Sequence, residues 1–239
     1  MMPTNLRDRH ALLVSVVRLG RGWYVDSTPK TAPKLPLELF EFEACPYCRK
    51  VREVMTELDL SYICRPCAKG SNNRKHVIDR GGKAMFPYLV DPNTGREMYE
   101  SEDIITYLMT EYGPGRGLAS RALAPLNTAG ASVATMVRPL HGLRANGGAD
   151  RTQPELLLEV YGYEASPFCR KVRETLHELN LDHRVANVGK KSARRPELVS
   201  RGGTMQVPYL VDPNTGTEMY ESEEIMRYLH ETYGVQAAL

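Results

Sequence analysis

The order of apolar and polar residues predicts the first elements of the chain. Apolar and polar side chains largely alternate from Leu37 to Phe42, which is typical of a half-buried β-strand. Apolar residues then recur at helical spacing, at Val51, Val54, Met55 and Leu58. The pattern after this helix predicts a strand at about 61–65, a helix at about 72–80, strands at about 87–90 and 96–99, and a helix that begins at Ser101 as its N-cap.

An internal repeat sets the domain organisation. Residues 37–113 return without a gap as residues 158–234, at an offset of about 121 residues, with roughly half of the positions identical. A unit of this length is a domain, so we expect an α/β protein with two βαβαββα domains. The boundaries that we expect are an N-terminal extension at 1–34, a first domain at 35–113, a linker at 114–154 and a second domain at 155–239. The extension and the linker could each carry a helix, or the linker could be irregular.

The junction between the first strand and helix carries the chemistry. Cys45 precedes Pro46, which suits the first position of a helix. Unsatisfied backbone amides and the helix dipole at this position favour a thiolate, which predicts a reactive, low-pKa cysteine. Cys48 lies one turn further along and could close a disulfide with Cys45. Positive charge at Arg49, Lys50 and Arg52 is expected to favour the thiolate further.

Composition narrows the classes of protein. A net charge of +2 in 239 residues is too small for a nucleic-acid-binding surface. Apolar runs stay well short of the roughly 20 residues that cross a membrane. Five cysteines are too few for a disulfide framework and suit a reducing compartment. We therefore expect a cytoplasmic protein whose partners are small molecules or other proteins, not nucleic acid or membrane.

The combination of these motifs resembles a known family. The CPYC motif at Cys45 to Cys48, an X-Pro at Pro87 and a Glu-Ser pair at Glu100 resemble glutaredoxins and, more closely, transferase-like glutaredoxins and the thioredoxin-fold N-terminal domain of glutathione S-transferases. Both units share this resemblance, which implies tandem thioredoxin-like domains without the all-helical C-terminal domain of a full transferase. The two units could pack as an internal pseudo-dimer.

The resemblance implies roles for individual residues and glutathione as the cofactor. Cys45 would be the nucleophile and Cys48 the resolving thiol. The residues implied to bind glutathione in the first unit are Tyr47, Phe86, cis-Pro87, Glu100 and Ser101. A Glu-Ser pair at a helix start suits the γ-glutamyl end, which needs a carboxylate for its ammonium and helix amides for its carboxylate. Glutaredoxins often carry a lysine just before the motif, where this chain has Phe42 and Tyr163.

The second unit differs at the reactive position. Ser166 replaces the first cysteine, so thiol–disulfide exchange cannot start there, whereas Cys169 remains. This unit could hold a degenerate, transferase-like glutathione site, or it could be a structural copy. The residues of that second site would be Ser166, Cys169, Val207, cis-Pro208, Glu221 and Ser222.

A second cysteine pair occurs only in the first unit. Cys64 and Cys67 follow the second strand, where the repeat has Val185 and Val188. Parallel first and second strands would bring both cysteine pairs to one edge of the sheet. The pair could relay electrons, share a zinc or iron–sulfur centre, or be incidental. The spacing of the four cysteines also fits a zinc ribbon, but a helical pattern fills the gap between the pairs.

Three functions are compatible with these features. The leading interpretation is a glutathione-dependent thiol–disulfide oxidoreductase acting on disulfide or glutathionylated substrates. The first alternative is a glutathione-conjugating or dehydroascorbate-reducing transferase. The second is a binding module for glutathione, metal or an iron–sulfur cluster, without turnover. The histidines show no metal-ligand spacing, and we expect them to be surface or core residues: His10, His76, His141, His177, His183 and His230.

Overall fold

The structure is a computed structural model that describes residues 13, 15, 18, 20–117, 122, 124–136, 141–146 and 151–234. The first unit follows the predicted order, with ends that differ from the prediction by one or two residues. Its elements are β1 (Leu37–Glu41), α2 (Pro46–Glu57), β2 (Tyr62–Pro66), α3 (Asn73–Gly81), β3 (Tyr88–Asp91), β4 (Arg96–Met98) and α4 (Ser101–Glu111). Gly82 ends α3 in the left-handed conformation, which glycine adopts without strain.

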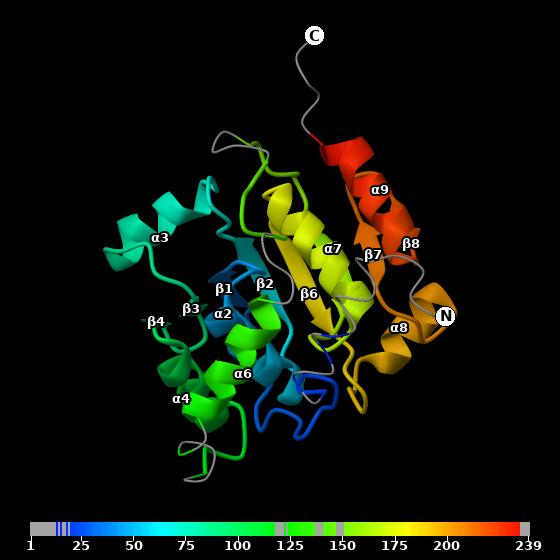
Figure 1. Ribbon diagram of the computed structural model, residues 1–239. Helices are drawn as coiled ribbons and strands as arrows, with labels where there is room; N and C mark the ends of the chain where they lie inside the picture. Colours follow the sequence, from blue (N-terminus) through cyan, green and yellow to red (C-terminus); the bar gives the residue numbers. More distant parts are fainter. Residues whose placement is uncertain are drawn as a thin grey trace.

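The second unit repeats this order. Its elements are β5 (Leu158–Gly162), α7 (Pro167–Glu178), β6 (His183–Asn187), α8 (Arg195–Gly202), β7 (Tyr209–Asp212), β8 (Thr217–Met219) and α9 (Ser222–Tyr233). A further helix, α6 (Ala124–Met136), lies between the units in sequence and packs against α2. Figure 1 shows the first unit in blue to green on the left and the second in yellow to red on the right.

One continuous sheet joins the units. Its strand order is β4-β3-β1-β2-β6-β5-β7-β8. Within each unit the first two strands are parallel and the last two antiparallel, as expected for this fold. The second strands of the two units pair antiparallel, with Ile63 opposite Arg184. The units therefore pack as an internal pair related by an approximate two-fold axis between β2 and β6.

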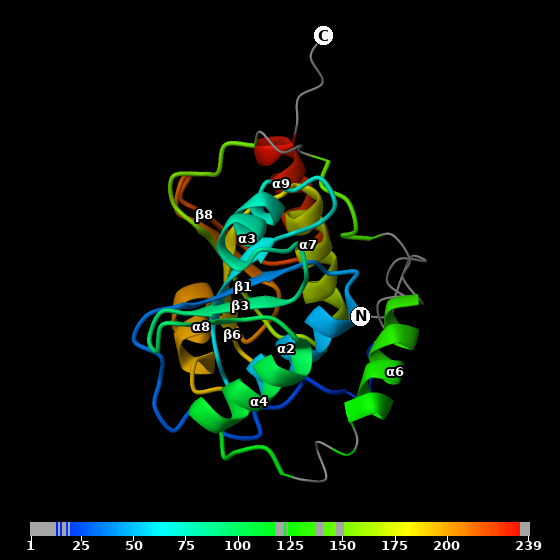
Figure 2. The ribbon, with the colours of Figure 1, turned by 90° about the vertical axis from the view of Figure 1, so that its left-hand side faces the viewer.

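Two layers of helices cover the sheet. The larger cores pack α2 and α4, or α7 and α9, onto strand residues such as Leu39 and Leu158. The smaller cores lie on the opposite face, where α3 covers Phe40 and α8 covers Tyr161. In Figure 2, α8 lies to the left of β6, and α7 and α6 lie to the right. The faces alternate along each strand because successive side chains point in opposite directions.

The pseudo-symmetry extends beyond the two units. Tyr24 forms an isolated bridge with Lys190, and Arg144 forms the equivalent bridge with Lys69. The segment before each unit thus contacts the other unit in the same way. Residues 15–18 and 135–138 are weakly similar in sequence, and both segments lie partly outside the described residues. No helix in the described part of the chain has the length and hydropathy of a membrane span.

Candidate functional site

The Cys45 thiol lies at the N-terminus of α2, as predicted. A turn closed by the Cys45 amide and the Phe42 carbonyl follows β1, and Pro46 opens the helix. The Cys45 Sγ accepts a hydrogen bond from the Cys48 amide at 3.2 Å, so the sulfur itself caps the helix. The same sulfur is 4.0 Å from the Phe86 carbonyl oxygen, at the residue before Pro87. This geometry stabilises a thiolate next to a backbone edge that a peptide could pair with.

The two thiols of the motif differ in acidity. Burial raises the pKa of Cys45, but hydrogen bonds from the Cys48 thiol and from backbone amides outweigh burial and lower it below the usual value. Burial and the neighbouring Cys45 raise the pKa of Cys48 well above its usual value. Cys48 is fully buried, whereas Cys45 retains slight exposure. Cys45 is therefore the thiol suited to attack a disulfide, and Cys48 the thiol suited to act second.

The third strand presents the expected backbone edge in both units. The Phe86–Pro87 and Val207–Pro208 peptide bonds are both cis, which confirms that prediction. Arg74, on α3, lies with its guanidinium 5.0 Å from the centre of the Phe86 ring and 5.7 Å from that of Phe42. Its Nε donates to the Cys67 carbonyl at 2.9 Å. A cation thus lies beside the strand edge even though Phe42 replaces the usual lysine, and the repeat of Arg74 as Arg195 was a signal that we missed.

The Glu-Ser pair has a geometry that we did not predict. Ser101 was expected to be the N-cap of α4, but it is the first helical residue, and Glu100 holds the cap position. Glu100 and Glu221 both have left-handed backbone, with φ of 64° and 67°. Such backbone is strained for a non-glycine residue and tends to occur at binding sites. Neither glutamate caps its helix with its side chain in the described structure, and the Glu221 carboxylate instead accepts a hydrogen bond from the Gln206 Nε2 at 2.6 Å.

An ion pair brings the start of α4 toward the CPYC motif. The Lys50 Nζ lies 2.6 Å from Glu102 and 5.6 Å from the centre of the Tyr47 ring. Tyr47 is the large exposed residue of the motif, at 48% exposure. The N-termini of α2 and α4, which carry Cys45 and Glu100, therefore flank one surface. Lys171 and Glu223 form the same pair in the second unit.

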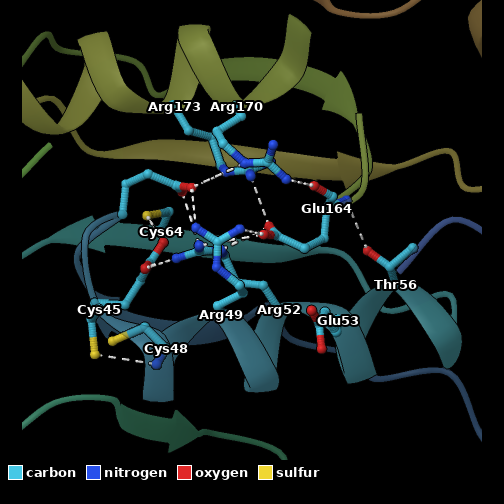
Figure 3. A network of polar contacts seen from close by, with 12 residues as sticks. Cys45, Cys48, Arg49, Arg52, Glu53, Thr56, Cys64, Glu164, Arg170 and Arg173 are labelled. Atoms are coloured by element: carbon cyan, nitrogen blue, oxygen red, sulfur yellow. Dashed lines mark hydrogen bonds and ion pairs between the residues drawn. The ribbon is translucent and has the colours of Figure 1, made fainter. Parts of the chain in front are cut away.

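The arginines of α2 do not act as we predicted. Arg49 and Arg52 point away from Cys45 and into the interface between α2 and α7, as Figure 3 shows. Arg52 lies 2.9 Å from both Glu43 and Glu164, and Arg173 lies within 3.0 Å of the same two carboxylates. We call this group the central ion cluster, and all its members are at least nine-tenths buried: Glu41, Glu43, Arg49, Arg52, Glu164, Arg170 and Arg173. These charges join the two units, and the arginines pair with the buried carboxylates instead of lying beside the Cys45 sulfur.

A buried histidine from the second unit reaches the first unit's active-site turn. His177 Nδ1 accepts a hydrogen bond from the Glu43 amide at 2.7 Å. His177 Nε2 lies 3.3 Å from the Cys64 Sγ and 3.4 Å from Glu41 Oε1. At the equivalent positions of the repeat, Gly162 stands for Glu41, Val185 for Cys64 and Thr56 for His177. Three of the positions at which the units differ therefore meet at one point. Sequence spacing missed this cluster because its residues come from three elements.

The cluster of Glu41, Cys64 and His177 has donors suited to zinc. A backbone amide can only donate, so Nδ1 carries a lone pair and the neutral ring carries its proton on Nε2. A metal on Nε2 would need the lone pair that this tautomer lacks. The hydrogen bonding therefore fits a closed polar network better than a metal centre.

Cys64 and Cys67 lie apart on the two faces of the sheet. Cys64 is inside β2, opposite Leu39, and packs in the core under α2. Cys67 packs in the core under α3, with Phe40 and Val77. We had expected both at the end of the strand beside Cys45, but residues three apart in an extended segment point in opposite directions. Burial raises the pKa of both thiols well above the usual value.

The second unit repeats the scaffold with a hydroxyl. Ser166 Oγ accepts a hydrogen bond from the Cys169 amide at 3.2 Å, so it caps α7 as Cys45 caps α2. Cys169 is buried, and burial raises its pKa above the usual value. The local backbone is thus preserved while the nucleophile is absent.

A match to a family model agrees with the fold. The model of the family "Glutathione S-transferase, N-terminal domain" matches residues 39–116 and 160–237, more than half of the chain. A glutathione S-transferase-like protein of Aspergillus fumigatus, tpcF, is 33% identical over 76 residues, which are 32% of this chain and 33% of that protein. The chain thus spans about a third of the length of this relative. A trimeric glutathione transferase of Leishmania, TDR1, aligns with 86% of this chain and 68% of its own, at 16% identity and a TM-score of 0.34.

Proposed function

Because the chain belongs to the family of proteins that carry the glutathione S-transferase N-terminal domain, we propose that it is a glutathione-dependent thiol–disulfide oxidoreductase acting through Cys45 and Cys48. One observation carries the proposal. The Cys45 sulfur caps α2 beside the Phe86 carbonyl, while the second thiol of the motif lies fully buried behind it. A conjugating transferase has no use for a second thiol, whereas in disulfide reduction the second thiol opens a route through an intramolecular disulfide.

The proposed reaction begins on a glutathione mixed disulfide. The Cys45 thiolate attacks the glutathione sulfur, forms a Cys45–glutathione disulfide and releases the substrate thiolate, which takes a proton from water. A glutathione thiolate then attacks that disulfide, which yields oxidised glutathione and restores the Cys45 thiolate. Two glutathione molecules are thus joined for each substrate disulfide reduced. Alternatively, Cys48 loses its proton and displaces glutathione, and two further glutathione molecules reduce the Cys45–Cys48 disulfide.

Residues around Cys45 supply recognition of the tripeptide in this proposal. The Phe86 backbone would pair with the cysteinyl residue, as a strand edge pairs with an extended peptide. The Glu100 carboxylate would bind the γ-glutamyl ammonium, and the amides at Ser101 would bind its carboxylate. Arg74 would face the glycine carboxylate, which supplies the positive charge that Phe42 does not.

The second unit would contribute binding or structure but no exchange chemistry. Ser166 has the position of Cys45 and can donate a hydrogen bond to a thiolate, but it cannot form a disulfide. Glu221 shares the strained backbone of Glu100. Glutathione binding there, without turnover, is therefore the function that we assign to it.

Reduction of a glutathione mixed disulfide tests the proposal, with glutathione, glutathione reductase and NADPH as the coupled system. We expect Cys45→Ser to abolish turnover and Cys48→Ser to retain the route that needs one thiol. Cys45→Ser should fold, because the second unit already carries serine at the equivalent position. Unchanged turnover in Cys45→Ser would contradict the assignment. Turnover of dehydroascorbate or of an electrophile, with no disulfide reduction, would favour the transferase alternatives.

A further inference from the structure

The turn that carries Cys45 is held from the other unit. Glu43 is the second residue of this turn, which runs from Phe42 to Cys45. Its amide donates to His177 Nδ1 at 2.7 Å, and its carboxylate accepts from the Arg173 Nε at 3.0 Å. Both partners project from α7, more than 100 residues away in sequence. The backbone that presents the nucleophile thus depends on the unit that has none.

The same contact exists in the other direction with a different residue. The Glu164 amide, equivalent to that of Glu43, donates to the Thr56 hydroxyl at 3.3 Å. Thr56 is the repeat equivalent of His177, so each unit supplies one acceptor to the other's turn. The acceptor for the reactive turn is the imidazole, and its bond is the shorter one. His177 is fully buried, so water cannot substitute for it.

The contacts of the His177 Nε2 fix the orientation of the imidazole ring. Because Nδ1 accepts, Nε2 carries the proton and faces Glu41 Oε1 and the Cys64 sulfur. Glu41 is held in turn by Arg52 of the central ion cluster. The ring is therefore locked between two elements of the first unit, and its lone pair is directed at the Glu43 amide.

We propose that His177 is a positioning residue for the Cys45 thiol: the second unit uses this imidazole to hold the Glu43 amide and so keeps the sulfur at the N-terminus of α2. This inference rests on the proposed redox role of Cys45. Loss of the bond would free the turn and let the sulfur leave the helix amides that stabilise its thiolate. The second unit then acts as a permanent support for the first unit's site, whatever it binds itself.

Two substitutions of His177 by residues of equal shape, threonine and valine, separate the effect of the hydrogen bond from the effect of packing. His177→Thr copies the acceptor that Thr56 supplies in the other unit, and His177→Val has the same shape without it. Both remove the Nε2 proton equally. The control is Thr56→Val, which removes the equivalent bond from the Ser166 turn. The measurement is the pH profile of Cys45 alkylation by iodoacetamide, followed by mass spectrometry in the full chain.

We expect His177→Val to raise the apparent pKa of Cys45 by about half a unit to one unit, since helix-terminus interactions are of that size. His177→Thr should lie closer to the wild-type profile, and Thr56→Val should match it. Equal profiles for His177→Val and His177→Thr would overturn the inference. If His177→Val does not fold, His177→Leu, which fills more of the buried volume and also lacks an acceptor, takes its place in the comparison with His177→Thr.

The profile also separates this inference from the proposed function. If the variants show the expected differences in Cys45 alkylation but the wild-type chain reduces no mixed disulfide, the proposed function is refuted and the positioning role stays in place. If the wild-type chain reduces the mixed disulfide but the Cys45 profile is the same in His177→Val and His177→Thr, the positioning role is refuted and the proposed function stays in place.

Discussion

Removal of one arginine from the central ion cluster should destabilise the whole chain. The Arg173 side chain is 6% exposed and lies 3.0 Å from Glu43 and 2.7 Å from Glu164. Arg173→Met would leave two buried carboxylates short of one cation while largely preserving volume. Breaking a buried pair in this way costs about 3–5 kcal/mol. That is a large part of the roughly 5–15 kcal/mol that stabilises a typical domain.

Urea unfolding followed by circular dichroism measures this effect. The matched control is Arg227→Met, because Arg227 and its partner Glu224 are 62% and 49% exposed and such a pair contributes less than about 1 kcal/mol. The double variant Arg173→Met/Glu43→Gln should recover part of the loss, since it removes one of the stranded charges. A loss below about 1 kcal/mol in Arg173→Met would refute the view that the cluster joins the units.

Three further predictions concern acidity, recognition and the second unit. Burial raises the pKa of Glu41, but Arg52 and His177 outweigh burial and lower it from 4.5 to about 2. The ionised Glu41 therefore stabilises the fold fully at a pH above 4.5, its pKa in the unfolded chain, and this stabilisation is lost as the pH falls toward 2. The free energy of unfolding from urea titrations should drop by up to about 3 kcal/mol over this range, and by less in Glu41→Gln. Arg74→Met should raise the KM for the mixed disulfide by about five- to tenfold with little change in kcat, whereas the equivalent Arg195→Met should change neither, because one charge-assisted hydrogen bond is lost only at the reactive site. Ser166→Cys in a Cys45→Ser background should restore measurable turnover, since α7 and the cis-proline already have the required geometry, and complete inactivity would show that the second unit cannot support exchange.

Most of the fold could be predicted from local sequence patterns. The alternation from Leu37, the helical spacing from Val51 and the return of both patterns from Leu158 depend on neighbouring residues, so the sequence predicted the elements and their order within each unit. The cis bonds at Pro87 and Pro208 followed from the resemblance and are present. The pairing of β2 with β6 is a contact between units, and no local pattern indicated which strands would meet.

Charged residues show why the site was harder to predict. Arg49 and Arg52 have the sequence signature of exposed, cationic helix positions, and we placed them beside Cys45. They are buried because a second helix with the same arginines lies opposite, together with glutamates from both turns. His177 and Arg74 escaped notice because their partners lie on other elements. Comparison of the two repeats marks position 177 as different, since the repeat has Thr56 there, but so many other positions differ that this alone does not single out His177.

The central claim is that Cys45 is the residue that exchanges with glutathione. Incubation of the Cys48→Ser variant with oxidised glutathione, followed by intact-mass and peptide mass spectrometry, tests it most directly because the resolving thiol can no longer release the product. The account predicts one glutathione per chain, attached to Cys45, while the buried Cys64, Cys67 and Cys169 remain unmodified. A chain that takes up no glutathione, or takes it up at another cysteine with Cys45 unmodified, would contradict it.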